Sequence, residues 1–381
     1  MKTGDSVKMK FVIFAPKGLK TGGPEGMHQL AWALNKLGQE ARLLAWPETK
    51  GNLAVNEYKK YEPKWCQVSE VNKTDIFIVS ESIRLLPFWY LAFISRKRIY
   101  RWMHSVDFSL EKDLNQYERN NYPINSEWNA NTIRVSKLKF FLKRTGFLGI
   151  YHNVKHYTKL IKKSAFKWHV KIDSENYLFA SYYSLHTVTK LKNSNSNLLL
   201  SGWVNGVNLE SIEDIEFCEC PKNHIAYNPA KSRELMNRII EINLSRSTEI
   251  HFMPIAGIKT DLEVYKLLSS CDLYLDLGFF PGLERTPREA IKMGCPVLLA
   301  KRGAARFYED FPISTTYLLD LSLLGPHQTY ETILKVLSLG KTTNLKNQRA
   351  FQNFVLNEKA TFLIEVERFI LGLNKVNRRG Y

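Results

Sequence analysis

The chain lacks a hydrophobic run long enough to cross a membrane. Its longest apolar stretch, residues 85–94, has ten residues and contains Pro87, whereas a membrane-spanning helix needs about 20. No signal peptide is recognisable at its start. The five cysteines are odd in number and have no paired CxxC spacing, so we expect buried, reduced thiols rather than a disulfide framework or a zinc site.

Acidic residues are missing from one long segment. Residues 132–172 hold eleven Lys or Arg and no Asp or Glu, and they supply most of the net charge of +17. Large apolar and aromatic residues alternate with these cations, which is typical of a segment that docks on an anionic membrane surface. The alternative is a solvated basic face over a core helix. No nucleic-acid partner is expected, because the sequence contains no helix-turn-helix, zinc-finger or RNP-type signature.

Apolar strands alternate with amphipathic helices in both halves of the 381-residue chain. The pattern begins with a strand at 10–15, a glycine-bearing loop, a helix at 25–37 and a strand at 40–45. Such alternation predicts parallel, doubly wound sheets. We therefore expect an α/β fold of two Rossmann-like domains facing a cleft, 1–205 with the basic insertion and 206–381 with a C-terminal helix.

The segment 276–300 carries the strongest chemical signal. It reads as a strand, a loop, a helix capped by Thr286 and a second strand, and two acids and two arginines crowd its loop and first helical turn: Glu284, Arg285, Arg288 and Glu289. Helix N-termini and arginine forks bind phosphate, and a carboxylate accepts from a ribose diol. This predicts a site for a nucleotide diphosphate and its sugar. Alternatively, Thr286 and Glu289 form only a capping box.

Four segments resemble the GT-B glycosyltransferases, in particular family 4 and its relatives in capsule and lipopolysaccharide clusters. Residues 21–38, which begin Thr-Gly-Gly-Pro-Glu-Gly, look like the family's first loop and helix. Residues 289–298 look like the end of its two-glutamate motif and the strand after it. Residues 227–231 and 281–289 are similar to a subgroup of these glycosyltransferases.

The resemblance implies that a sugar moves from a nucleotide-sugar donor to a lipid-linked or saccharide acceptor in cell-surface polysaccharide synthesis. It also implies that protein cations and helix N-termini, rather than a metal or another cofactor, stabilise the leaving diphosphate. Glu289 is the candidate for the ribose. The candidate cations for the rest of the donor are Lys231, Arg285 and Arg288. The residues expected to bring backbone amides close to it are Gly22, Gly23, Gly303 and Ala304.

Three residues are candidates for catalysis. His104 follows a strand of the first half and resembles the family's cleft histidine, although a structural role is the alternative. Asp107 is the alternative base for an inverting reaction. The family places two glutamates eight positions apart, and the position eight before Glu289 is Pro281. Glu284 is the candidate to replace the missing glutamate, and the stereochemical outcome stays open.

We expect a cytoplasmic enzyme, peripheral on the inner face of the cytoplasmic membrane and docked there through residues 132–172. Two other enzymes of the same fold are alternatives, a polyol-phosphate transferase and a sugar-nucleotide epimerase. The basic aromatic segment disfavours a soluble epimerase. A non-catalytic nucleic-acid-binding protein is a further alternative, and only the charge favours it.

Overall fold

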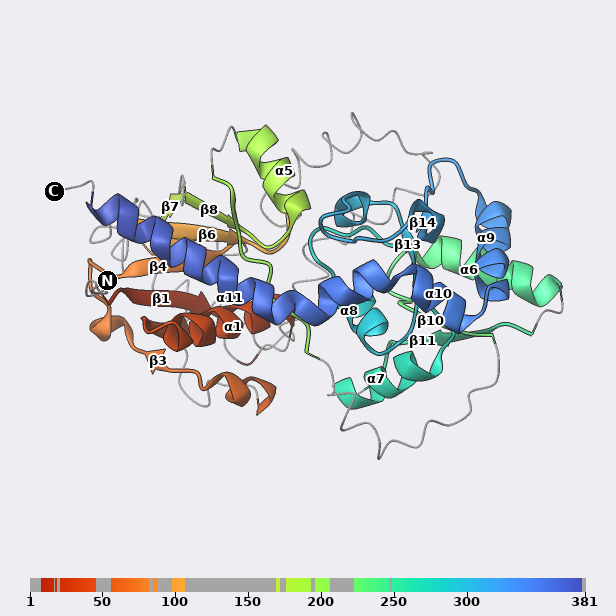
Figure 1. Cartoon of the computed structure of the whole chain (residues 1–381), viewed down its shortest axis with the longest axis horizontal. Helices are drawn as coiled ribbons and strands as arrows, with labels where there is room; N and C mark the ends of the chain where they lie inside the picture. The colour runs from red at the N-terminus through yellow and green to blue at the C-terminus, as the bar shows by residue number, and fades with distance from the viewer. Residues whose placement is uncertain are drawn as a thin grey trace, which may run out of the picture.

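Two parallel β-sheets lie side by side along the long axis of the computed structural model, and helices pack around each (Figure 1). The structure describes residues 8–16, 18, 21–45, 56–81, 85–87, 98–106, 169–171, 176–192, 196–205, 223–246, 249–258 and 260–378. The predicted α/β class with two Rossmann-like sheets is confirmed.

The first sheet has seven parallel strands in the order β3-β2-β1-β4-β6-β8-β9. Its inner strand β1 (Lys10–Ala15) is buried on both faces, which explains the uninterrupted apolar sequence from Phe11 to Ala15. Phe11 and Ile13 pack in a core shared with α1 (Gly22–Lys36), while Val12 and Phe14 pack on the opposite face. The strands are β1 (Lys10–Ala15), β2 (Glu40–Ala45), β3 (Trp65–Cys66), β4 (Ile76–Ser80), β6 (Ile99–Met103), β8 (Asn176–Phe179) and β9 (Leu198–Leu199).

The second sheet has five parallel strands in the order β11-β10-β12-β13-β14. They are β10 (His224–Tyr227), β11 (His251–Pro254), β12 (Leu273–Asp276), β13 (Val297–Ala300) and β14 (Leu318–Leu319). The helices between and after them are α6 (Arg233–Ser245), α7 (Asp261–Ser270), α8 (Arg285–Lys292) and α9 (Pro326–Ser338). Parallel strands bring the loops after β10 and β12 to one edge of the sheet, and α8 begins there.

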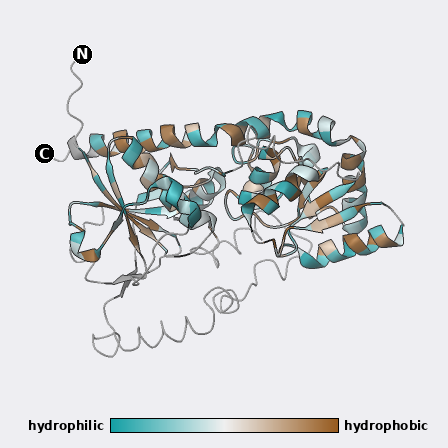
Figure 2. Ribbon diagram, turned by 90° about the horizontal axis from the view of Figure 1, so that it is seen from below, coloured by the Kyte–Doolittle hydropathy of each residue, from teal (hydrophilic) through white to brown (hydrophobic). Residues whose placement is uncertain are grey.

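The C-terminal segment forms two helices where the sequence predicted one. α10 (Lys341–Asn347) ends before Gln348, and α11 (Arg349–Arg378) follows. The fully buried Gln348 side chain accepts from the Val297 amide at 2.9 Å and donates to the Val297 carbonyl at 2.8 Å. These two hydrogen bonds fix the residue between α10 and α11 to the start of β13. α11 then runs along both halves (Figure 2). Its Phe362 and Val366 pack into the core of the first sheet.

The two halves touch through side chains and backbone. Asp310, in the loop after β13, accepts from the amides of Tyr182 at 2.7 Å and Tyr183 at 2.8 Å. These amides begin α5 (Tyr182–Lys192), which belongs to the first half, so a carboxylate of one half caps a helix of the other. The amide of Val106, after β6, donates to the Pro281 carbonyl at 3.1 Å.

Most of the basic segment 132–172 lies outside the described residues. Its strand β7 (His169–Lys171) pairs antiparallel with β5 (Leu85–Pro87).

Candidate functional site

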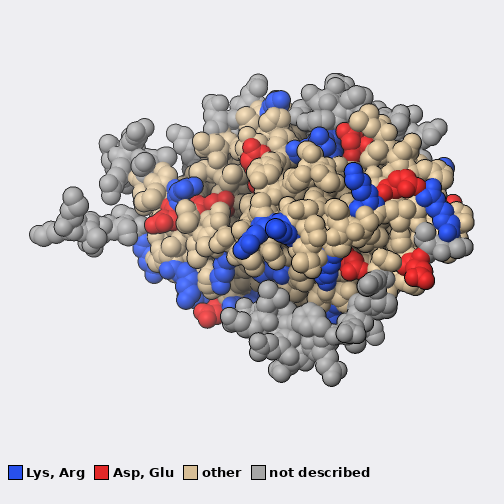
Figure 3. Space-filling model, turned by 45° about the vertical axis from the view of Figure 1, so that its right-hand side comes forward, with Lys and Arg blue, Asp and Glu red and all other residues tan. Residues whose placement is uncertain are grey.

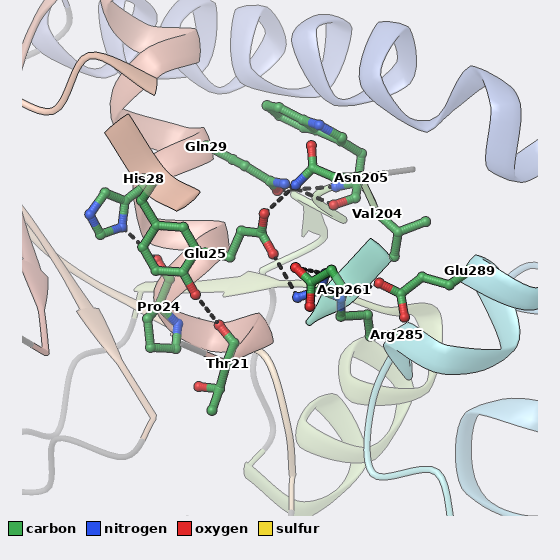
Figure 4. A network of polar contacts seen from close by, with 12 residues as sticks. Thr21, Pro24, Glu25, His28, Gln29, Val204, Asn205, Asp261, Arg285 and Glu289 are labelled. Carbon is green, nitrogen blue, oxygen red and sulfur yellow. Dashed lines mark hydrogen bonds and ion pairs between the residues drawn. The ribbon is translucent and has the colours of Figure 1, made fainter. Parts of the chain in front are cut away.

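Three helices begin close together where the halves meet. Arg285 is the first residue of α8, Asp261 is the first residue of α7, and Glu25 lies in the first turn of α1. The Arg285 guanidinium donates to Glu25 at 3.1 Å and to Asp261 at 3.4 Å (Figure 4). Helix N-termini carry partial positive charge. Their convergence on an arginine makes this junction favourable for negatively charged groups.

Glu289 points toward this junction and not toward its own helix end. Its carboxylate accepts from Arg285 and, at 3.2 Å, from the Tyr265 hydroxyl. Only 5% of Glu289 is exposed, and burial raises its pKa although Arg285 and Tyr265 act in the opposite direction. α8 begins at Arg285, so Thr286 is inside the helix and does not cap it. The capping-box alternative is therefore wrong.

Glu25 was not predicted as a site residue. One of its oxygens accepts from the Tyr61 hydroxyl at 3.0 Å and from the Asn205 amide, and Lys60 lies 3.9 Å away. The other oxygen contacts Arg285. Burial and the charge of Glu25 raise the pKa of Tyr61 above its usual range. Glu25 thus joins the two halves through a carboxylate that is held from both sides.

Lys231 lies in a second cluster, at the end of β12. Its Nζ atom is 3.2 Å from Asp276 and 3.2 Å from Glu284, and it lies over the Phe280 ring at 4.8 Å. Burial alone lowers the pKa of Lys231, but the two carboxylates outweigh it and raise the pKa. Gly278 makes room for the lysine, because a Cβ there would lie 2.4 Å from the lysine side chain.

Two of the three predicted cations, Lys231 and Arg285, therefore occupy neighbouring clusters that share the start of α8. Glu284, which pairs with Lys231, directly precedes Arg285. Five carboxylates surround three cations across the two clusters: Glu25, Asp261, Asp276, Glu284 and Glu289, with Lys60, Lys231 and Arg285. Burial alone lowers the pKa of Arg285, but Glu289 and Glu25 outweigh it and raise the pKa above its usual range.

Arg288 points away from these clusters. Its guanidinium pairs with Glu358 of α11 at 2.8 Å and donates to the carbonyls of Leu283 and Glu284, both at 3.1 Å. Arg288 is 6% exposed. Glu358 also accepts from the Val204 amide at 2.9 Å, in the chain crossing between the halves. These contacts give Arg288 a structural role: through Glu358 it fixes α8 to α11 and to the backbone at Val204.

The turn at Gly303 packs closely against Phe280. Its φ is +56°, and a Cβ there would lie 2.1 Å from the Phe280 carbonyl oxygen. The amide of Ala304 donates to that same carbonyl at 2.8 Å. The expectation that Ala304 offers its amide to a ligand is therefore wrong in this arrangement, because the Phe280 oxygen already accepts from it. The turn instead fixes the loop that follows β12.

Gly22 and Gly23 begin α1 and remain accessible. Among the described residues, a Cβ at either position would meet nothing within 4 Å, and Gly22 is exposed. Packing does not require glycine here. Both residues lie at the N-terminus of α1, one turn before Glu25, where backbone amides have no partner within the helix.

His104 lies at the contact between the halves. Its ring packs on Trp102 with centroids 4.1 Å apart, and its carbonyl lies so close to Gly282 that a Cβ there would be 2.1 Å from the oxygen. Burial lowers the pKa of His104 to about 3, so the imidazole is neutral at neutral pH. Its Nε2 atom is buried and has no partner among the described residues. Asp107 lies outside the described residues.

Within the described part of the chain, no group of three or more His, Cys, Asp or Glu side chains could hold a metal ion. The helices of that part include none that is both long and apolar enough to span a membrane.

Two solved structures share this architecture over nearly the whole chain. A glycosyltransferase from Rickettsia africae is 14% identical and covers 97% of this chain and 98% of its own, with a TM-score of 0.56. The chain has the GT-B fold. A second GT-B structure, sucrose-phosphate synthase from Thermosynechococcus elongatus, is 9% identical, covers 98% of this chain and 99% of its own, and has a TM-score of 0.51. No family model and no curated protein matches the sequence.

Within this GT-B fold, the structure brings some of the predicted residues together. Glu289 and Arg285 meet in one cluster, and Lys231 and Glu284 meet in the other. Sequence reasoning missed Glu25, Asp261, Tyr265 and Asp276. Glu25 directly follows the Gly-Gly-Pro of the loop at α1, and Asp276 ends a predicted strand, but neither position shows which side chains it will meet.

Proposed function

We propose that the protein is a glycosyltransferase that moves a sugar from a nucleotide-sugar donor to a lipid-linked or saccharide acceptor in cell-surface polysaccharide synthesis. The observation that carries this proposal is the convergence of three helix N-termini on Arg285, beside the accessible start of α1. Such a site suits the diphosphate of a nucleotide sugar. The fold is also that of the glycosyltransferase from Rickettsia africae.

In this proposal the donor spans the start of α8. The Glu289 carboxylate accepts from the ribose hydroxyls, as Tyr265 and Arg285 fix its orientation. Arg285 and the amides of Gly22 and Gly23 face the diphosphate. As the sugar leaves, negative charge grows on the diphosphate, and preorganised positive groups stabilise that charge. The proposal therefore assigns this task to protein groups and to no metal ion.

Lys231 and Glu284 contribute at the sugar end of the donor. The raised pKa of Lys231 keeps it charged, and its two carboxylate partners hold it in place. Glu284 has an oxygen within reach of Lys231 and lies in the loop where the family's first glutamate is expected. The neutral His104 can accept a hydrogen bond from a hydroxyl, while its pKa of about 3 makes it a weak proton acceptor. Asp107 is the alternative base.

The lipid-linked acceptor is proposed from the sequence alone. The basic aromatic segment 132–172 belongs to the first half, and its cations would draw the enzyme to anionic lipid at the inner face of the cytoplasmic membrane. A lipid-linked acceptor is presented at such a surface.

The proposal is tested by thermal shift against nucleoside diphosphates and nucleotide sugars. We expect one base to raise the melting temperature more than the others, because binding to the folded state stabilises it by mass action. The stabilised complex then identifies the donor for a transfer assay. Stabilisation by DNA or RNA alone would contradict the proposal and favour the nucleic-acid alternative.

A further inference from the structure

Glu25 brings a carboxylate from one half of the molecule to an arginine of the other. Its Oε2 atom lies 3.1 Å from Nη1 of Arg285, which is 260 residues away in sequence. Glu25 is only 6% exposed. It is therefore a buried anion at the convergence of the three helix N-termini, in the first turn of α1.

The two oxygens of Glu25 have different partners. Oε1 is held within the first half by the Tyr61 hydroxyl at 3.0 Å and by the side-chain amide of Asn205. Oε2 is the oxygen that reaches Arg285 (Figure 4). The first set of contacts keeps the carboxylate in place when the second is broken. Separation of the halves therefore breaks the Arg285 contact and leaves Glu25 anchored.

Three carboxylates already surround the Arg285 guanidinium. Glu289 is four residues along the same helix, and Asp261 is in the same half with its side chain 39% exposed. A diphosphate brought to Arg285 would add further negative charge to this partly buried cluster. Like charges that share one partly buried site repel each other, because water screens them less than at an exposed surface. Of the three carboxylates, Glu25 is the one that belongs to the other half of the molecule.

We propose that Glu25 occupies on Arg285 the position that the donor's diphosphate takes, so that donor binding exchanges a carboxylate for a phosphate. This rests on the function proposed above and adds a regulation of the same site. Carboxylate and phosphate oxygens both accept from the guanidinium fork, which makes the exchange chemically direct. Without donor, the Glu25–Arg285 ion pair holds the halves together and competes with the ligand. With donor, Arg285 turns to the phosphate and Glu25 keeps Tyr61 and Asn205.

The exchange is tested by titrating inorganic pyrophosphate in a calorimeter, without added divalent cations. Pyrophosphate carries the diphosphate chemistry whatever the donor's base is. We expect Glu25→Gln to bind pyrophosphate about tenfold more tightly than the wild type, because the competing charge is gone while the shape stays. Asp261→Asn is the matched control: it removes the same charge from the same arginine but within one half, and we expect a gain of about twofold.

A second variant keeps the test independent of the folding of the first. Tyr61→Phe keeps the charge of Glu25 and removes the hydroxyl that anchors Oε1. We expect it to bind pyrophosphate more tightly than the wild type by about twofold to threefold, because a carboxylate without this anchor loses more conformational freedom when it contacts Arg285 and therefore competes less well. Pyrophosphate affinities of Glu25→Gln and Tyr61→Phe that equal the wild type, or fall below it, would overturn the exchange.

The outcome separates this inference from the proposed function. Tighter pyrophosphate binding by Glu25→Gln supports the exchange even if the panel of nucleotide sugars fails to stabilise the wild type. In that case the proposed function falls and the ion-pair exchange stands. If nucleotide sugars stabilise the wild type but Glu25→Gln gains no affinity beyond that of Asp261→Asn, the function stands and the exchange falls.

Discussion

Glu289 contacts the Arg285 and Tyr265 side chains and does not cap its own helix. α8 begins without a side-chain cap. A true capping box is found nearby in α7, where Thr260 accepts from the Glu263 amide at 3.2 Å and Glu263 accepts from the Thr260 amide at 3.1 Å. The two glutamates therefore offer a direct comparison of the roles that the sequence left open.

Glu289→Ala should weaken binding of the donor's nucleoside diphosphate by about 1.5–3 kcal/mol, the range for hydrogen bonds to a charged group. Glu289→Gln should bind with intermediate affinity, since it keeps one acceptor oxygen. Calorimetry with the nucleotide found in the thermal-shift screen measures both. Glu263→Ala is the control, and it should lower the melting temperature with nucleotide affinity unchanged. If Glu289→Ala behaves like Glu263→Ala, Glu289 is structural.

Sequence reasoning found site residues where a local pattern contains them. Arg285 and Glu289 lie within one helical turn of a recognisable segment, so spacing alone places them together. Glu25 and Arg285 are 260 residues apart, and only the packing of two sheets makes them neighbours. Arg288 is a case in which the local pattern does not reveal the partner of the side chain. Its residue type and position fit a phosphate contact, but it pairs with Glu358 of a helix whose path the sequence does not reveal.

At the scale of elements, the strands were the most predictable part. Strands such as β1 and β2 are buried apolar runs between glycine-bearing loops, and their bounds agree with the expectation. The start of α8 was harder, because Thr286 and Pro287 are good residues for a helix start but the helix begins one residue before Thr286. The break between α10 and α11 depends on Gln348 meeting Val297, a contact that no local pattern contains.

Asp310 links two elements and gives stability a dependence on pH. Burial raises its pKa from an ordinary value of 3.8 to about 7, although the Tyr183 and Tyr182 amides that donate to it act in the opposite direction. The folded state thus holds a proton that the unfolded state releases at lower pH. The contribution of this group is fully present below the unfolded pKa and is lost as pH rises through the folded pKa.

The free energy of unfolding of the wild type, relative to Asp310→Asn, should therefore fall between about pH 4 and pH 7, by on the order of a few kcal/mol. Urea unfolding of both proteins across this range measures the difference. The charged groups that act on Asp310, Glu309 and Arg288, are present in both proteins and largely cancel. Parallel curves for the two proteins would show that Asp310 does not titrate in this range.

At the scale of the whole molecule, the positive charge is unevenly distributed along the chain. Basic and acidic side chains are intermixed on the face shown in Figure 3. Eleven of the chain's cations fall instead in residues 132–172, where no acid balances them. A one-signed segment beside large apolar residues is suited to an anionic lipid surface, whereas an intermixed surface is suited to water.

This uneven distribution of charge makes membrane docking testable by charge reversal. Lys139, Lys143, Lys159 and Lys163 changed to Glu should release the protein from anionic liposomes and leave nucleotide binding intact. The attraction is worth about 1 kcal/mol for each basic residue near the bilayer and is screened by salt. Sedimentation of wild-type protein with liposomes should therefore increase with anionic lipid and decrease with ionic strength.

The control for this prediction reverses four exposed lysines outside the segment, Lys59, Lys266, Lys335 and Lys346. Both variants then have the same net charge, so a difference between them reports on the position of the charge and not on its amount. Docking through residues 132–172 requires the first variant to be released while the control still sediments with the liposomes. Equal sedimentation of the two variants would contradict it, since net charge alone would then account for the binding. Pelleting that depends on added RNA would instead favour the nucleic-acid alternative.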